Sequence, residues 1–226
     1  MALQIGMLLF PRLTQLDFTG PQEVLARIPG AQVHHVAKTR DPVTAETGLT
    51  LVPNTTFAEL PRIDLLFVPG GVGQIEAAED GETLAWLRGA GEHAKWITGA
   101  CTGALLLGCA GLLQGYRAAT HWAFMDLLPI VGAIPTAKRV VVDRNRITGG
   151  GVTAGIDIAL TIVAEVAGRD QAEAIQLQLE YDPEPPFRSG HPNVARPELV
   201  AQIRAAIGKR HDERRAQLQR LVTRSG

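Results

Sequence analysis

The stretch Trp96-Ile97-Thr98-Gly99-Ala100-Cys101-Thr102-Gly103 runs from a β-branched, apolar segment into a turn that carries a cysteine, and the helical pattern Ala104-Leu105-Leu106-Leu107 follows it. Its last five residues have the form G-x-S-x-G, with a thiol in place of the hydroxyl. Such a nucleophile elbow turns so sharply that small residues are needed two positions before and after the nucleophile. The stretch therefore predicts a strand, a tight turn and a helix, which is the repeating unit of a parallel α/β sheet.

The same alternation of short apolar runs and helical patterns extends through most of the chain, as in a parallel sheet with helices on both faces. We expect strands at Ile5 to Phe10, Gln32 to Lys38, Leu65 to Val68, Trp96 to Gly99, Arg139 to Asp143 and Arg146 to Thr148. We expect helices at Pro21 to Arg27, Glu82 to Glu92, Thr102 to Leu112, His121 to Leu128, Thr153 to Val166 and Asp170 to Glu180. Thr19-Gly20-Pro21 is predicted to open the first helix, because proline is favoured in the first turn. The predicted fold class is α/β with a mainly parallel central sheet.

The chain has 226 residues, which fits one large domain and a short appendage. The proline-rich segment 182–186 is expected to stop the last helix of a domain that spans residues 1–195. Residues 196–226 form a basic arm with eight Lys and Arg against three Asp and Glu. Its apolar positions have helical spacing, so we expect an amphipathic helix that packs on the domain or on a partner subunit. These positions are Leu199, Val200, Ile203, Ile207, Leu218 and Leu221.

Composition excludes several classes of function. With 46% hydrophobic and 20% charged residues the chain can build a substantial core, which rules out intrinsic disorder. The net charge of −1 gives no global reason to bind nucleic acid or an anionic membrane. No apolar run reaches the ~18 to 20 residues of a membrane span. The first ten residues lack a basic start and a cleavage site, so we interpret them as a strand and not as a signal peptide.

The two cysteines, Cys101 and Cys109, are eight positions apart in a predicted helix. That spacing separates them by about 12 Å along the helix axis, too far for a disulfide. Free thiols favour a cytoplasmic location. Cys109 lies in mid-helix and is expected to pack in the core, as most free cysteines do. Cys101 stands at a helix N-terminus, where unpaired N–H groups favour an anion, so we expect its pKa to be lowered and its thiolate to form.

Two glycine runs follow predicted strands at the edge of the sheet where open α/β folds bind ligands. Gly70 and Gly71 come after the strand that ends at Val68, and a second run ends at Gly151. Glycine lets the backbone approach a ligand closely, although ordinary tight turns use the same residues. We expect the N–H groups of Gly70, Gly71 and Thr102 to form an oxyanion-type cradle.

A proton carrier is also needed, and Asp17 is the main candidate. It lies between Leu16 and Phe18, so partial desolvation should raise its pKa toward a useful range; the alternative is a helix-capping aspartate. His121 is the main histidine candidate, and a core or helix-start histidine is an equally good interpretation. The sequence has no H-E-x-x-H or C-x-x-C spacing, so we expect no metal site. No organic cofactor is expected either.

Together these segments resemble the ThiJ/PfpI superfamily over nearly the whole chain. The matching motifs are Gln15-Leu16-Asp17-Phe18-Thr19-Gly20-Pro21, Val68-Pro69-Gly70-Gly71, Thr98 to Gly103 and Thr120-His121-Trp122, with further matches at 111–115, 148–157 and 177–181. The resemblance implies a flavodoxin-like three-layer sandwich of the class I glutamine amidotransferase-like type, and a homodimer. Within the superfamily the motifs are most similar to the bacterial isocyanide hydratases, which add water to an isocyanide to give an N-substituted formamide.

The resemblance implies that Cys101 is the nucleophile, Asp17 the general acid/base and Thr102 the residue after the elbow. Protease-like members usually have histidine at the place of Thr102, and glyoxalase-type members generally have glutamate at the place of Asp17. We expect Gly151, Val152 and His121 to line the substrate pocket, with Val152 at a place where a slightly larger aliphatic residue is usual. The expected reaction forms a covalent thioimidate on Cys101 that water resolves, and the expected partner is a small isocyanide.

Two other functions fit parts of the pattern. One is a glyoxalase or deglycase acting on small α-dicarbonyls, and the other is a sensor domain related to transcription regulators. A regulator needs a helix-turn-helix pair beyond the sensor. The 30 residues after Arg196 are enough for one long helix and not for a DNA-binding domain.

Overall fold

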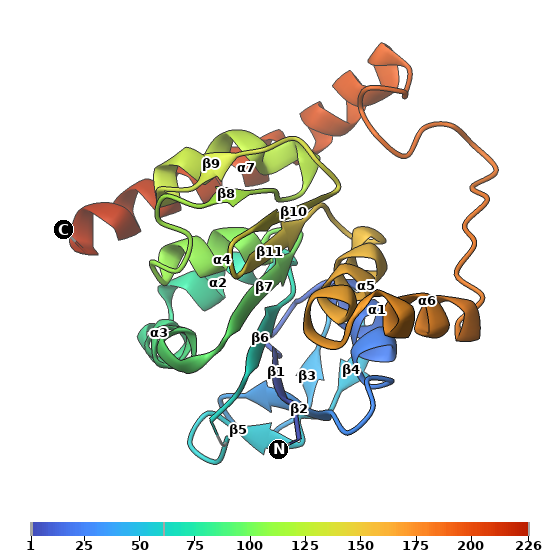
Figure 1. Cartoon of the computed structure of the whole chain (residues 1–226). Coiled ribbons are helices and arrows are strands. Elements are labelled where there is room, and N and C mark those ends of the chain that lie inside the picture. The colour runs from blue at the N-terminus through green and yellow to red at the C-terminus, as the bar shows by residue number, and fades with distance from the viewer. Residues whose placement is uncertain (1, 61, 226) are drawn as a thin grey trace.

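A mainly parallel sheet of seven strands forms the centre of residues 2–60 and 62–225, the part of the chain that the computed structural model describes (Figure 1). Its strands are β1 (Gln4–Leu8), β2 (Gln32–Ala37), β5 (Thr55–Thr56), β6 (Leu65–Val68), β7 (Trp96–Ala100), β10 (Val140–Asp143) and β11 (Arg146–Gly149). Their order across the sheet is β10-β11-β7-β6-β1-β2-β5. The β10–β11 pair is antiparallel and the other neighbouring pairs are parallel.

Helices cover both faces of this sheet, which makes the three layers of a flavodoxin-like fold and confirms the predicted class (Figure 1). One face carries α1 (Gln15–Leu25), α5 (Ala154–Ala167) and α6 (Arg169–Gln178). The other carries α2 (Gln74–Glu79), α3 (Gly81–His93) and α4 (Gly103–Cys109). Two short pairs lie outside the central sheet, β3 (Val43–Thr44) with β4 (Thr50–Leu51) and β8 (Arg117–Ala118) with β9 (Ile134–Pro135).

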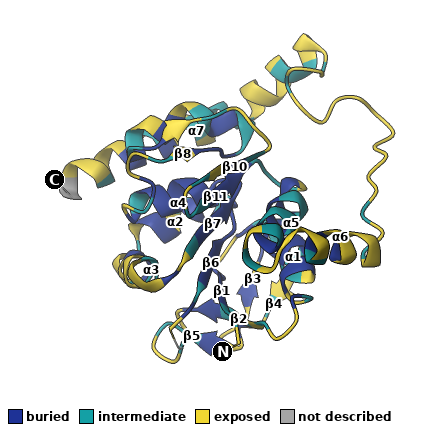
Figure 2. Ribbon diagram, viewed as in Figure 1, coloured by how far each residue is buried: buried dark blue, intermediate teal, exposed yellow. Residues whose placement is uncertain are grey.

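The hydrophobic core of the protein is built around the central strands of the sheet. The four residues of β6, Leu65-Leu66-Phe67-Val68, are all fully buried, because helices cover them from both sides. Figure 2 shows this buried centre in dark blue, with most exposed residues on the helices, in the loops and on the outer strands. The apolar run in the sequence therefore marks the middle of the sheet.

The strand order reverses between β1 and β6, and this reversal decides where a ligand can bind. In open α/β sheets the crevice at such a switch point lies beyond the carboxyl ends of the strands. The loop after β1 leads to Asp17, the loop after β6 holds Gly70 and Gly71, and Cys101 directly follows β7. The topology thus brings these segments to one edge.

The predicted start of the first helix is wrong. The helix begins at Gln15, so Asp17 lies in its first turn and Pro21 lies inside it, six positions after its first residue. Proline lacks the N–H that would reach back to the Asp17 carbonyl, and this gap is tolerated where the helix packs closely on α5. A Cβ atom added to Gly155 of α5 would lie 3.0 Å from the Pro21 ring, so the two helices are in close contact at this glycine and this proline.

Other predicted boundaries also change. The segment expected as the helix His121 to Leu128 is a 3₁₀ helix, η1 (Trp122–Val131), with Pro129 inside it. The helix expected to reach Leu112 ends at Cys109, and the one expected to reach Glu180 ends at Gln178, ahead of the proline-rich segment. Each predicted strand overlaps an observed one.

The basic arm is a long helix, α7 (Pro197–Ser225), that lies along η1 and contacts α2 and α4 of its own chain (Figure 1). An extended segment of exposed residues, 182–190, leads from the region of α6 out to this helix. Leu218 is fully buried, and Arg214 and Gln217 are each about 1% exposed. None of the described helices has the length and apolar character that crossing a membrane requires.

Candidate active site

Cys101 stands at a strained turn between β7 and α4. Its φ of 53° is in the left-handed region, which is unfavourable for a residue with a side chain. A carbon added to Gly99 would lie 2.9 Å from Leu107, and one added to Gly103 would collide with the Val68 carbonyl. The two glycines of the elbow are therefore required by space, as the sequence predicts.

Hydrogen bonds hold this turn in its strained form. The Cys101 N–H donates to the carbonyls of Gly149 and Gly150 at 3.2 and 3.1 Å, and the Thr120 hydroxyl donates to the Cys101 carbonyl at 2.7 Å. These contacts come from the end of β11 and from the loop after β8, segments outside the strand-turn-helix unit. The tertiary structure thus fixes a conformation that the local sequence alone would not keep.

Asp17 is fully buried and faces the thiol. Its Oδ2 accepts a hydrogen bond from the Gly70 N–H at 3.2 Å, and its Oδ1 accepts none from the described residues. Burial raises the pKa of Asp17 to about 7, while interactions with the Cys101 thiol and the Gly70 N–H act in the opposite direction. The predicted rise in pKa is therefore confirmed, and near neutrality the carboxyl exists in both protonation states.

The expected lowering of the Cys101 pKa is wrong. Burial raises the pKa of this thiol well above its ordinary value, and the neighbouring Asp17 carboxylate raises it further. The Thr102 N–H and the guanidinium of Arg214 act in the opposite direction and are outweighed. The elbow donors are present, but the thiol is 6% exposed and loses more hydration than they replace. The raised pKa favours the protonated thiol, and Asp17 is its hydrogen-bond partner.

The glycine turn after β6 is tied to the residue after the nucleophile. The Gly71 N–H donates to the Thr102 hydroxyl oxygen at 3.0 Å, and that hydroxyl donates to the Gly71 carbonyl at 3.2 Å. Gly71 has a φ of 143°, and a side-chain carbon there would press on the backbone of Leu13 and Thr14. Two of the three N–H groups expected in an oxyanion cradle, those of Gly70 and Gly71, thus have partners within the protein. Their role toward a ligand stays a prediction.

A cavity of about 150 Å³ opens onto the sulfur. It contains Cys101, Thr102, His121 and Val152 from the predicted set, and Gly71 at its edge. Gly151 lies against the thiol, because a carbon added to it would stand 2.7 Å from the Cys101 sulfur and 2.9 Å from His121. Asp17 and Gly70 do not line this cavity; they lie behind the thiol, where the Gly70 N–H donates to Asp17.

His121 combines the two interpretations that the sequence left open. Its Nδ1 accepts a hydrogen bond from the Ala123 N–H at 3.3 Å, which makes it the capping residue of η1, and its ring lines the cavity. Burial lowers its pKa, and the positive charge of Arg214 lowers it further. The imidazole is thus held neutral beside the thiol.

Sequence reasoning missed the contributions of α7 and of the loop before β4. Ile207, Arg210 and Arg214 of α7 line the cavity with Glu46, Phe124, Thr14 and Val72. One signal could have found Arg214: it falls on the apolar stripe of the helix, seven positions after Ile207 and four before Leu218. A basic residue on a buried stripe is unusual and points to a specific partner.

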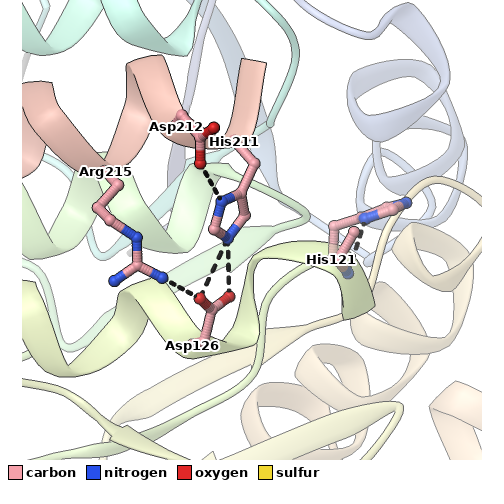
Figure 3. A network of polar contacts seen from close by, with 6 residues as sticks. His121, Asp126, His211, Asp212 and Arg215 are labelled. Carbon is pink, nitrogen blue, oxygen red and sulfur yellow. Dashed lines mark hydrogen bonds and ion pairs between the residues drawn. The ribbon is translucent and has the colours of Figure 1, made fainter. Parts of the chain in front are cut away.

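A polar network outside the cavity fixes α7 to η1 (Figure 3). His211 Nε2 lies 3.0 and 3.1 Å from the two carboxylate oxygens of Asp126, and Arg215 pairs with the same carboxylate. Burial tends to raise the Asp126 pKa, but the contacts with His211 and Arg215 outweigh it and hold that pKa below its ordinary value. The His211 ring also stacks on Phe124, which forms a wall of the cavity.

A larger cavity of about 420 Å³ lies elsewhere, among the ends of β1 and β2 and the helix α2. Its lining residues include Phe10, Val43 and Phe57, with Arg12 and Glu76 among the charged ones. It contains none of the residues around the thiol, so size alone does not identify the reactive site. Among the described residues, no cluster of three or more His, Cys, Asp or Glu side chains could hold a metal ion.

A thiol at a strained strand-to-helix turn of a parallel sheet, with a buried carboxyl beside it, defines a class of cysteine-dependent α/β proteins. The chain belongs to the DJ-1/PfpI family, which residues 4–165 match. This confirms the resemblance found in the sequence.

Individual relatives extend over more of the chain than the family match. The isonitrile hydratase of Pseudomonas putida is 55% identical over 204 residues, which make up 90% of each protein. A crystal structure of a ThiJ/PfpI family protein from Pseudomonas syringae is 45% identical, with a TM-score of 0.94 over 96% of this chain and 91% of that one. The HTH-type transcriptional regulator GbdR of Pseudomonas aeruginosa is 29% identical over 79% of this chain but only 50% of the regulator.

Proposed function

We propose that this chain is an isocyanide hydratase, a lyase that adds water to R–N≡C and releases R–NH–CHO. The observation that carries the proposal is the contact between a buried carboxyl with a pKa of about 7 and a thiol at the elbow. The identity of 55% with the isonitrile hydratase of P. putida over 90% of both chains supports it. The catalytic residues in this proposal are Cys101, Asp17 and Thr102.

The first step makes the nucleophile and the covalent intermediate. The Asp17 carboxylate takes the proton of the Cys101 thiol, and the thiolate attacks the terminal carbon of the isocyanide. A carbon–sulfur bond forms while protonated Asp17 returns its proton to that carbon, which gives the thioimidate R–N=CH–S–Cys101. A pKa near 7 suits both halves of this transfer, because the carboxyl must accept and donate at neutral pH.

The second step releases the product. Asp17 takes a proton from water as the water oxygen attacks the thioimidate carbon, and it passes that proton to the substrate nitrogen. The carbon–sulfur bond then breaks, the hydroxyl proton goes to the Cys101–Asp17 pair, and the formamide leaves. The N–H group of Thr102 faces the sulfur and would stabilise it as it departs. No step needs a metal or an organic cofactor.

The walls of the cavity favour a small apolar substituent on the isocyanide. Val72, Phe124, Val152 and Ile207 supply apolar surface around a space of about 150 Å³. An isocyanide has no hydrogen-bond donor of its own, and such a lining imposes no penalty of unpaired polar groups on it. We propose Gly151, Val152 and His121 as the part of the pocket nearest the sulfur.

The direct test is formamide production from an alkyl isocyanide by purified protein. Cys101→Ala should abolish it, and Asp17→Asn should lower kcat/KM by roughly 100-fold or more, as expected for loss of a general acid/base. Cys109→Ala is the matched control, because it removes a thiol that lies eight residues away. A fully active Cys101→Ala protein would overturn the proposal.

The same assay compares the competing activity. The chain should hydrate the isocyanide and leave methylglyoxal unchanged; the reverse result would make it a glyoxalase or deglycase. The regulator alternative is tested by a gel-shift assay, in which salt-sensitive, sequence-selective binding to DNA would support a sensor role. We expect no binding, in line with the net charge of −1.

We also propose the organisation in which this enzyme works. Residues 1–195 form the α/β domain and residues 196–226 the helical arm, two copies make a homodimer, and the protein acts in the cytoplasm. Both cysteines are free, which fits a reducing compartment. The dimer is supported by three exposed apolar side chains on α6 and the segment that follows it: Leu177, Phe187 and Val194.

A further inference from the structure

Arg214 is a buried cation at the cavity that holds the thiol. Its side chain comes from α7, is about 1% exposed, and is fixed by three contacts. Its Nε donates to Gln74 Oε1 at 2.8 Å, its Nη2 donates to the Gly71 carbonyl at 2.9 Å, and its guanidinium lies 4.4 Å from the centre of the Phe124 ring. The position of the charge is therefore well defined.

This cation has no carboxylate partner among the described residues, since none of the ion pairs found there includes it. Two other arginines of the same helix do have carboxylate partners: Arg215 pairs with Asp126, and Arg220 pairs with Glu79. Burying an unpaired charge is unfavourable, and burial lowers the Arg214 pKa to about 10. After burial, the next influence on that pKa is Cys101, whose thiolate would stabilise the cation.

The contact with Gly71 connects Arg214 to the elbow. The Gly71 carbonyl accepts from Arg214 and from the Thr102 hydroxyl, and the Gly71 N–H donates back to that hydroxyl. Thr102 is the residue whose own N–H faces the sulfur. One guanidinium thus acts on the thiol through its charge and through the backbone that positions Thr102.

We propose that Arg214 is a positioning residue of the thiol site, which stabilises the Cys101 thiolate when Asp17 removes the thiol proton and holds the Gly71–Thr102 pair in place. This inference rests on the proposed function in taking Cys101 as the nucleophile. Arg214 lies outside residues 4–165, which match the family, so α7 adds an electrostatic element that the family motifs do not contain.

The charged groups around Cys101 determine the pH at which its thiol ionises. Asp17 faces it from α1, His121 from the start of η1, Glu46 from the loop before β4, and Arg210 and Arg214 from α7. The Asp17 carboxylate opposes the thiolate and Arg214 favours it, whereas Glu46 raises the pKa of Asp17. Removing Arg214 should therefore move the ionisation of the thiol to higher pH.

The test is the rate at which iodoacetamide alkylates Cys101 in the full-length protein, followed by mass spectrometry of its peptide, from pH 6 to the highest pH at which circular dichroism shows the protein folded. R214M should move the midpoint of the rate–pH curve up by about one unit, which is roughly a tenfold slower reaction below both midpoints. R214K keeps the charge but not the two-armed hydrogen bonding, so its midpoint should stay closer to that of the native protein. K209M, on the same helix and with a side chain that is 92% exposed, is the control and should leave the curve unchanged.

The same variants separate this inference from the proposed function. With an alkyl isocyanide, R214M should lower kcat about tenfold with little change in KM, and R214K should restore part of the loss. An unmoved midpoint in R214M would overturn the role of Arg214 even if formamide is made. A moved midpoint in a protein that makes no formamide would leave the role standing and remove the hydratase.

A second neutral variant, R214Q, keeps the test usable if R214M does not fold. R214Q keeps a donor for the Gly71 carbonyl and should show the same upward shift as R214M. If neither neutral variant folds while R214K does, Arg214 acts through stability and not through the thiol, and the proposal fails.

Discussion

Cys101 and Asp17 form a coupled pair: the Asp17 carboxylate raises the pKa of the thiol, whereas the hydrogen bond with the thiol lowers the pKa of Asp17. Burial is the largest cause of the raised pKa of both groups, and each group's charge or hydrogen bond modifies the other. The resting pair is therefore a thiol beside a carboxyl that is half ionised near neutral pH. Reactivity depends on moving the proton within the pair and not on a thiolate that is present at rest.

Asp17 should make the protein less stable as pH rises. An aspartate in the unfolded chain has a pKa near 3.9, and in the folded protein the pKa is about 7, so the folded chain binds more protons between these values. Stability is then greatest below the lower pKa and falls until pH passes the upper one. Asp17→Asn removes this fall, and its stability advantage should be larger at pH 8 than at pH 5 by on the order of 2 to 3 kcal/mol.

Urea unfolding of both proteins at the two pH values measures this difference. The same pair of proteins in a Cys101→Ala background is the control, because there the carboxyl is still buried but has no thiol beside it. An advantage that does not change with pH would contradict the raised pKa of Asp17.

At the scale of elements, α7 is the part of the chain that completes the cavity. It contributes Ile207 and Arg214 to the lining, and the pairing of His211 and Arg215 with Asp126 fixes it to η1 (Figure 3). Exposed ion pairs of this kind contribute little each, so most of the docking energy should come from apolar burial. Leu218 is the fully buried apolar residue of this helix.

Leu218→Ala should therefore lower the free energy of unfolding by about 2 to 5 kcal/mol, because it leaves a cavity beneath α7. Val222→Ala is the matched control, since Val222 lies one turn further along and is 44% exposed, and its effect should stay within about 0.5 kcal/mol. Denaturant unfolding followed by circular dichroism measures both. Equal, small effects would mean that α7 is not part of the cooperative unit.

The sequence predicts elements where a local pattern decides them. Each predicted strand overlaps an observed strand, because a buried run such as Leu65 to Val68 carries its signal in four consecutive residues. The start of α1 was predicted wrongly because Pro21 was taken as a first-turn residue, although packing on α5 tolerates it inside the helix. The 3₁₀ form of η1 has no distinct pattern of its own.

The site was predicted where motifs carry it and missed where distant segments meet. Cys101, Asp17 and the glycine turns belong to local motifs, and the structure brings them next to one another. Arg214 reaches Gly71 across 143 positions of sequence, and no local pattern encodes that contact. The direction of the Cys101 pKa was also missed, because the number of groups that exclude water from the sulfur depends on the whole fold.

At the scale of the molecule, the segment between α6 and α7 is the part that the body of the protein leaves uncovered. It extends away from the sheet (Figure 1), and Leu177, Phe187 and Val194 are 82%, 76% and 63% exposed in and beside it. Large exposed apolar side chains along an extended segment can be covered when another chain packs against it. This is where we expect the second copy of the proposed homodimer.

Light scattering coupled to size-exclusion chromatography should give twice the mass of one chain at micromolar concentration. Phe187→Ser should shift the protein toward the monomer, because it removes apolar surface from the proposed interface, while Val222→Ser on α7 should not. A native protein that elutes as a monomer would contradict the dimer, and one whose mass is unaffected by Phe187→Ser would move the interface elsewhere.

The position of Arg214 near the end of the sequence has a consequence for biosynthesis. During translation Asp17 and Cys101 emerge from the ribosome more than a hundred residues before Arg214, whose positive charge favours the thiolate. In the proposed role of Arg214, a nascent chain can assemble the sheet while its thiol is still hard to ionise, and the thiol reaches its full reactivity only after the last helix has been made and docked.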